Sequence, residues 1–131
     1  MPLDLLNPDS LPAPFGYTQV VKAQGTATIY LSGQVGLDAA GNVAGENDLE
    51  AQLRQAFANL VAGVEAAGGR LEQLTKITTF IVNYESEMRL VYARARDDTF
   101  GSHRPASTLL GVQALAMPAF VCEVEGIAVL D

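Results

Sequence analysis

The chain has 131 residues, of which 49% are hydrophobic and 18% are charged, a composition that fits one globular domain over residues 1–131 and excludes a disordered chain. Eight Lys and Arg residues stand against fifteen Asp and Glu residues, and the resulting net charge of −7 argues against a nucleic-acid partner. The sequence has no membrane-length apolar run, no secretory signal and only one cysteine, so we expect a cytoplasmic protein without a membrane partner.

The N-terminal region is predicted to be extended. Four of the six prolines lie within residues 1–16, and proline fixes its own φ and restricts the residue before it, so this segment is expected to be an arm. Residues 17–23 and 27–35 are rich in β-branched and aromatic residues. Because only a short break containing Gly25 separates them, they are predicted to form a β-hairpin.

The middle of the chain alternates helix and strand. Residues 48–67 place apolar side chains at helical spacing, with Asn47 as the expected cap and Gly68 at the end. Residues 74–82 are predicted to form a strand because of their β-branched and aromatic content. A second helix is expected over residues 84–100.

The C-terminal region adds two strands, at residues 106–112 and 120–129. The order ββαβαββ predicts an α+β fold in which two helices cover one face of a mixed β-sheet. The other sheet face must then be polar or covered by something else. Because strand side chains alternate, Glu123 and Glu125 are expected to share one face of the last strand.

Short motifs spread along the chain occur together in a specific order. They are Gly16-Tyr17-Thr18-Gln19, Leu31-Ser32-Gly33-Gln34, Gln55 to Asn59, Ala66-Ala67-Gly68, the stretch KITTFIV, Pro105-Ala106 and Glu123-Val124-Glu125-Gly126-Ile127-Ala128. This set resembles the YjgF/RidA family, also named after UK114 and L-PSP. The resemblance implies a chorismate-mutase-like fold and a homotrimer, with a central β-barrel and a small cleft between each pair of neighbouring subunits.

The resemblance also implies an activity. The best-known reaction of that family is the hydrolysis of reactive enamines and imines, released by pyridoxal-phosphate enzymes, to ketoacids and ammonia, and it requires no metal or cofactor. The expected function is therefore that of a cofactor-independent deaminase, a hydrolase acting on a C–N bond of a small molecule. Two alternatives remain open: a non-catalytic metabolite-binding or chaperone-like trimer, and an endoribonuclease, which the charge of −7 opposes.

The resemblance is incomplete at the expected substrate clamp. In deaminating members an arginine directly follows the Pro-Ala pair and binds the substrate carboxylate through two parallel hydrogen bonds. Here Ser107 follows that pair, and Leu109 stands where the family has a cysteine. Ser107 offers a hydroxyl but no charge. Arg104 is a candidate substitute for the missing clamp, although a solvated loop residue is the simpler interpretation.

Three further residues match family site positions. Glu123 matches the acid thought to position the attacking water, Tyr17 matches a tyrosine at the cleft mouth, and Gly33 matches a position where the backbone approaches the ligand. Each also has a plain structural interpretation. Glu123 would be an exposed strand carboxylate, Tyr17 a half-buried aromatic residue, and Gly33 a bulge residue.

The remaining charged and metal-binding residue types suggest no second site. The predicted second helix carries a basic stripe of Arg89, Arg94 and Arg96, which we interpret as a solvated face or as trimer salt bridges and not as an RNA platform. His103 and Cys122 are the only histidine and cysteine, and they lie far apart in the sequence, so no metal site is expected.

Overall fold

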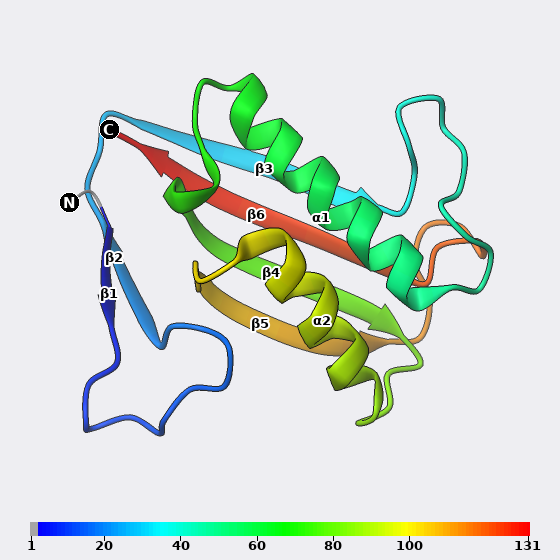
Figure 1. The fold of residues 1–131 in the computed structure, drawn as a ribbon, viewed down its shortest axis with the longest axis horizontal. Helices are drawn as coiled ribbons and strands as arrows, with labels where there is room; N and C mark the ends of the chain where they lie inside the picture. Colours follow the sequence, from blue (N-terminus) through cyan, green and yellow to red (C-terminus); the bar gives the residue numbers. More distant parts are fainter. Residues whose placement is uncertain (1–2) are drawn as a thin grey trace.

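The computed structural model describes residues 3–131. Two α-helices lie across one face of a four-stranded sheet, an arrangement that can be followed in Figure 1. The elements are β1 (Leu3–Leu6), β2 (Val20–Ala23), β3 (Ala27–Val35), α1 (Leu49–Ala66), the 3₁₀ turn η1 (Leu71–Gln73), β4 (Leu74–Val82), α2 (Met88–Phe100), β5 (Ala106–Val112) and β6 (Cys122–Leu130). The predicted α+β architecture, with both helices on one face of a mixed sheet, is confirmed.

The four-stranded sheet has the order β3-β6-β4-β5, in which β4 and β5 are parallel and β6 is antiparallel to both of its neighbours. Its core lies under α1, where Leu53, Phe57 and Leu60 are fully buried against the sheet. Burial of such side chains is the main source of stability for a domain of this size. Within residues 3–131, no helix combines the length and the apolar character needed to cross a membrane.

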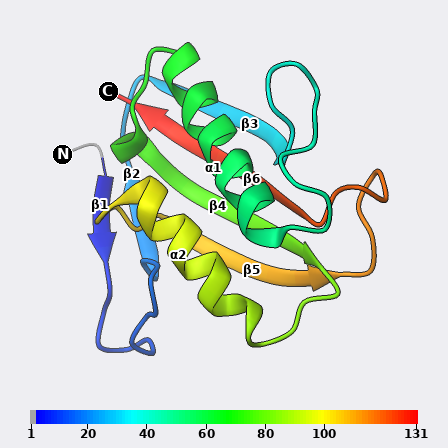
Figure 2. The same ribbon diagram turned by 45° about the vertical axis from the view of Figure 1, so that its right-hand side comes forward.

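The predicted hairpin between residues 17–23 and 27–35 is wrong. Strand β2 pairs with β1, which forms inside the expected N-terminal arm, whereas β3 pairs with β6. The cause lies at the turn: the Thr26 N–H donates to the Leu130 carbonyl at 2.9 Å, and a Cβ on Gly25 would collide with that carbonyl. The chain is therefore held against the end of β6, and β2 leaves the sheet. Figures 1 and 2 show the β1–β2 pair beside the end where β5 begins.

The helix boundaries differ from the predicted ones by a few residues. Asp48, and not Asn47, caps α1, because its carboxylate accepts a hydrogen bond of 3.0 Å from the backbone N–H three residues later. Gly68 ends α1 as predicted, with a φ of 88° that favours glycine. Helix α2 begins at Met88, later than expected, because residues 83–87 turn the chain back over the sheet.

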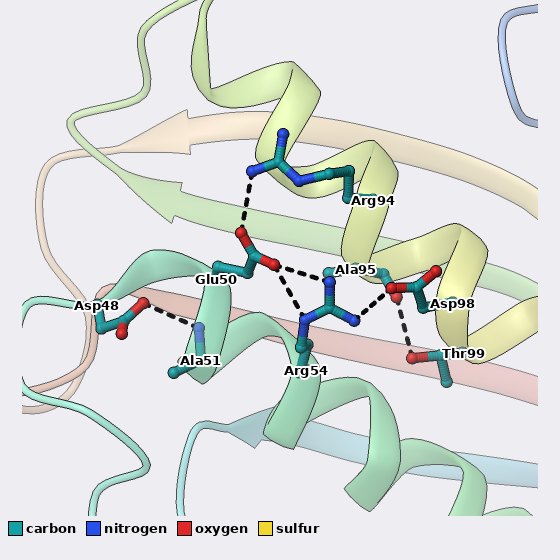
Figure 3. Close-up of polar contacts among 8 residues, drawn as sticks. All are labelled: Asp48, Glu50, Ala51, Arg54, Arg94, Ala95, Asp98 and Thr99. Carbon is teal, nitrogen blue, oxygen red and sulfur yellow. Dashed lines mark hydrogen bonds and ion pairs between the residues drawn. The ribbon is translucent and has the colours of Figure 1, made fainter.

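An ion-pair network joins the two helices across their exposed sides (Figure 3). Glu50 on α1 accepts from Arg54 at 2.7 Å and from Arg94 on α2 at 2.9 Å. Arg54 also pairs with Asp98 at 2.7 Å. The hydrogen bonds from Arg54 and then Arg94 lower the pKa of the Glu50 carboxyl. Arg94 therefore has a partner inside its own chain.

The second face of the four-stranded sheet carries no helix. On β6, Cys122 and Val124 are fully buried beneath the helices, whereas Glu125 is exposed, so Glu123 and Glu125 project from the opposite face as predicted. Tyr30 on β3 is 78% exposed. Among residues 3–131, both α-helices lie on the other face of the sheet (Figures 1 and 2).

Candidate functional site

A pocket of about 330 Å³ lies between α2, β5 and the loop that precedes β2. We call it the α2–β5 pocket. It is lined by Phe15, Gly16, Tyr17, Arg89, Tyr92, Arg96, Ser107 and Leu109. The fold thus brings together three of the predicted site residues, Tyr17, Ser107 and Leu109, from segments far apart in the sequence.

The β5 wall of the pocket faces the helices. In the β4–β5 ladder Ser107 lies opposite Ile77, whose side chain is fully buried in the core, so both side chains point toward the helical layer. The Ser107 hydroxyl lies 3.4 Å from the hydroxyl of Tyr92 on α2. The Tyr92 ring packs at a tilt against Phe57, with 5.9 Å between the ring centroids. This packing fixes the floor of the pocket.

Arg96 enters the α2–β5 pocket from the helical wall. Its side chain is 11% exposed, and the centre of its guanidinium lies 5.5 Å from the Tyr92 ring centroid. Its Nε and Nη2 atoms each lie 2.9 Å from a carboxylate oxygen of Asp97. On the other side it contacts Gly16 so closely that a Cβ there would collide with the guanidinium. Contacts with Tyr92, Asp97 and Gly16 thus hold the Arg96 guanidinium in place.

Arg89 stands one turn before Tyr92 and is exposed at the pocket edge. Within residues 3–131 it forms no ion pair. A second cavity of about 290 Å³ adjoins the first and shares Phe15, Gly16, Arg89 and Arg96 with it. The interpretation of the arginine stripe as a solvated face fits Arg94, which is exposed and pairs with Glu50. It does not account for Arg89 and Arg96, which line a pocket. Their spacing with Tyr92, at i, i+3 and i+7, is the signal that places all three on one helical face.

Arg104 lies outside the α2–β5 pocket. Its guanidinium donates to the backbone carbonyls of Gly101 at 2.6 Å and His103 at 3.1 Å, and it pairs with Asp97 at 3.0 Å. A cation at the end of a helix interacts favourably with the last carbonyls and with the helix dipole. The structure therefore explains Arg104 as a support for the C-terminus of α2.

Glu123 on β6 and Gly33 on β3 lie next to each other, outside the α2–β5 pocket. Gly33 belongs to an irregular stretch of β3, between Leu31 and Gln34, where the register with β6 shifts. The Glu123 carboxylate contacts the Gly33 backbone, and a Cβ at Gly33 would collide with it. Gly33 also lines a cavity of about 460 Å³ beside Asn59 of α1. Within one chain, the sheet separates this pair from Ser107.

Cys122 lines neither the α2–β5 pocket nor the cavity beside Gly33. Burial, and secondly the charge of Glu123, raise the pKa of the Cys122 thiol to about 12, so the thiol is protonated at neutral pH. Within the part of the chain that the structure describes, no three His, Cys, Asp or Glu side chains are arranged to hold a metal ion.

The sequence is similar to proteins of one family over nearly its whole length. Residues 8–130 match the family described as Endoribonuclease L-PSP. The chain is 31% identical over 131 residues to a 2-iminobutanoate/2-iminopropanoate deaminase from Dermatophagoides farinae, covering 99% of this chain and 98% of that protein. It is also 31% identical to a RutC family protein from Pyrococcus horikoshii, covering 92% of each.

Solved structures agree with this similarity. A Rid family protein from Yersinia pestis, described as being of unknown function, superposes with a TM-score of 0.92 at 30% identity and covers 99% of this chain and 100% of its own. The RidA protein from the Antarctic bacterium Psychrobacter sp. PAMC 21119 superposes with a TM-score of 0.70 at 29% identity, covering 97% and 99%. The similarity in sequence and fold therefore extends over nearly the whole chain.

Proposed function

The chain belongs to the Endoribonuclease L-PSP family, the YjgF/RidA family that its motifs resemble, and from this membership we propose that it hydrolyses small imines and enamines. Water adds to the carbon of the C=N bond, and the C–N bond then breaks. The products are a carbonyl compound and ammonia, and an enamine reacts through its imine tautomer. One observation carries the proposal: the Glu123 carboxylate is seated against the Gly33 backbone at an open sheet face.

Glu123 would transfer the proton in this reaction. Its carboxylate accepts a proton from the water that attacks the imine carbon and passes it to the nitrogen, which gives an aminoalcohol. It then moves the hydroxyl proton of this aminoalcohol to the same nitrogen, so that the carbonyl forms, the C–N bond breaks and ammonia leaves. The carboxylate is unchanged at the end, and no cofactor is needed for these steps. Tyr17 would donate a hydrogen bond to the substrate through its hydroxyl, and Gly33 would do so through its backbone N–H.

A complete site would need two copies of the chain. Glu123 and Gly33 lie on the side of the sheet opposite to Tyr17 and Ser107, so one chain alone cannot place both groups beside one substrate. We propose that the chains form a homotrimer, in which the pair from one copy meets the α2–β5 pocket of the next. The uncovered sheet face with its exposed Tyr30 supports such an association.

The test of the function is imine hydrolysis. An amino-acid oxidase would generate the imine in the presence of semicarbazide, and loss of the trapped product would report hydrolysis by the protein. Glu123→Gln should lower the rate by about 100-fold or more, as expected for loss of a general base. Glu125→Gln is the matched control, because Glu125 is an exposed carboxylate on the same strand and face. Equal rates for wild type and Glu123→Gln would overturn the proposal.

The two other functions give different results in the same experiments. A metabolite-binding trimer would bind a ligand without lowering the amount of trapped imine. A ribonuclease would still degrade RNA after stringent purification, and Glu123→Gln would lose that activity. Of these, binding without turnover has one observation in its favour, which is the serine at the position of the family's clamp arginine.

A further inference from the structure

We propose that Arg96, assisted by Arg89, binds the carboxylate of a small planar organic acid in the α2–β5 pocket, so that α2 supplies the cation that β5 lacks at Ser107. The inference deepens the proposed function and rests on it for the reaction, because the pocket would hold the carboxylate of the same substrate. The binding site itself rests on the geometry of the pocket, and a molecule that does not react can test it.

Position 107 on β5 and the Arg96 guanidinium border the same pocket. An arginine side chain at position 107 would project from β5 toward the helices, and the Tyr92 hydroxyl is only 3.4 Å from the Ser107 hydroxyl. The Arg96 guanidinium lies over the same tyrosine ring, at 5.5 Å from its centroid. Ser107 on β5 and Arg96 on α2 therefore lie beside the same tyrosine, and the guanidinium of Arg96 supplies the positive charge there.

The Arg96 guanidinium is held in place by its own chain, without a ligand. Asp97 engages Nε and Nη2 of Arg96, whereas Nη1 lies beside Gly16 and has no hydrogen-bond partner within residues 3–131. A guanidinium held in this way loses little conformational entropy when an anion binds. The free N–H groups of Nη1 can donate hydrogen bonds to a carboxylate. Ser107 and Tyr17, which both carry hydroxyls, line the same pocket.

The cluster of Arg89, Arg96, Arg104 and Asp97 carries a net positive charge. Asp97 is shared by Arg96 and Arg104, and Arg89 has no acidic partner among the described residues. Three positive charges and one negative charge leave this cluster positive, although the chain as a whole carries −7. The residues that line the pocket include no aspartate or glutamate. A positive, partly enclosed site of this kind concentrates small anions.

The lining of the α2–β5 pocket indicates the chemical class of the ligand. Phe15, Tyr92 and Leu109 give the pocket apolar and aromatic walls, which suit a flat hydrocarbon group. The pocket volume of about 330 Å³ fits a small molecule. A free phosphate would leave these walls without a contact, so the lining favours a carboxylate that carries an apolar or aromatic substituent.

Benzoate is the probe for this site, and benzamide is its uncharged control of nearly the same shape. Isothermal titration of the full-length protein at low ionic strength should show benzoate binding at least tenfold more tightly than benzamide. Arg96→Gln should weaken benzoate binding at least tenfold. Arg94→Gln should leave it unchanged, because Arg94 lies on the same helix but pairs with Glu50 and does not line the pocket.

A second variant keeps the test informative if Arg96→Gln does not fold. Ser107→Asp places a carboxylate on the β5 wall facing Arg96 and should abolish benzoate binding while the circular dichroism spectrum stays unchanged. Equal affinities for benzoate and benzamide, full benzoate affinity in Arg96→Gln or Ser107→Asp, or binding of inorganic phosphate but not of benzoate would each overturn the inference.

The outcomes separate the inference from the proposed function. Benzoate has no C=N bond, so its binding can be measured whether or not the protein hydrolyses imines. Arg96-dependent benzoate binding without imine hydrolysis would refute the function and support the inference. If Glu123→Gln removes hydrolysis but Arg96→Gln changes neither the KM for the imine nor the benzoate affinity, the function stands and the inference fails.

Discussion

Glu123 and Ser107 project from opposite faces of the same four-stranded sheet. Glu123 lies opposite Phe80 in the β4–β6 ladder, on the uncovered face, whereas Ser107 lies opposite the buried Ile77 on the helical face. Sheet geometry fixes this separation, because adjacent residues of a strand point to opposite sides. A reaction that uses both residues on one substrate must therefore be completed by a second chain.

Gly33→Ala should impair hydrolysis through Glu123. A Cβ at Gly33 would collide with the Glu123 carboxylate, which must then move away from the backbone. We expect kcat to fall by at least tenfold, because a general base must stay within hydrogen-bond reach of the water. Steady-state kinetics would measure the fall. Benzoate binding is the internal control and should not change, and an unaltered kcat would show that this contact has no catalytic role.

Gly16→Ala should weaken carboxylate binding through Arg96. The added Cβ would displace the guanidinium, and the φ of 74° at Gly16 adds a backbone cost of about 1 kcal/mol. Gly68→Ala is the matched control: its φ of 88° carries a similar backbone cost, but nothing lies within 4 Å of its Cβ. Both variants should lose a few degrees of Tm, and only Gly16→Ala should lose benzoate affinity. Equal affinities in the two variants would contradict the assigned role of Gly16.

Ser107→Arg restores the family's arginine and tests whether a positive charge on β5 can replace the one that Arg96 supplies from α2. Ser107→Arg alone should not improve benzoate binding, because a second guanidinium would be repelled by Arg96 beside the Tyr92 hydroxyl. In the Arg96→Gln background, Ser107→Arg should recover most of the lost affinity by supplying the charge from β5. Titration of the two single variants and the double variant measures this coupling. Strictly additive effects would argue that positions 96 and 107 serve different sites.

Cys122 should be unreactive in the folded protein. Because burial raises the pKa of its thiol from 9.0 to about 12, the nucleophilic thiolate is scarce near pH 8. A thiol reagent should label it only after denaturation. The same shift makes the free energy of unfolding fall with rising pH between those two values, since the unfolded chain releases the proton first. Rapid labelling of the native protein at pH 8 would contradict the buried placement.

The strands at 74–82 and 106–112 could be predicted with their observed bounds, because β-branched content and the flanking turn residues are local properties of the sequence. The pairing of β2 with β1 could not be predicted from the sequence. Its partner depends on how Gly25 and Thr26 meet the end of β6, a contact between segments about a hundred residues apart in the chain.

The site shows the same division between local and long-range information. The absence of an arginine at Ser107 is visible in the sequence, but its replacement by Arg96 is not, because only the packing of α2 against β5 brings the two residues to one pocket. A basic stripe on a predicted helix is usually a solvated surface. Here Gly16, Tyr92 and Asp97 turn one member of that stripe into a fixed cation.

The most direct test is complementation between two variants that are impaired in different functions, assayed at low imine concentration. Glu123→Gln and Arg96→Gln would be purified separately, mixed, denatured together and refolded, and light scattering should give three times the chain mass of 13.9 kDa. If each site takes Glu123 from one copy and Arg96 from another, random mixing at equal amounts should restore wild-type kcat/KM at about one quarter of the sites, although each variant alone is impaired in proton transfer or in substrate binding. Hydrolysis no greater than the sum of the two variants would contradict a site shared between chains.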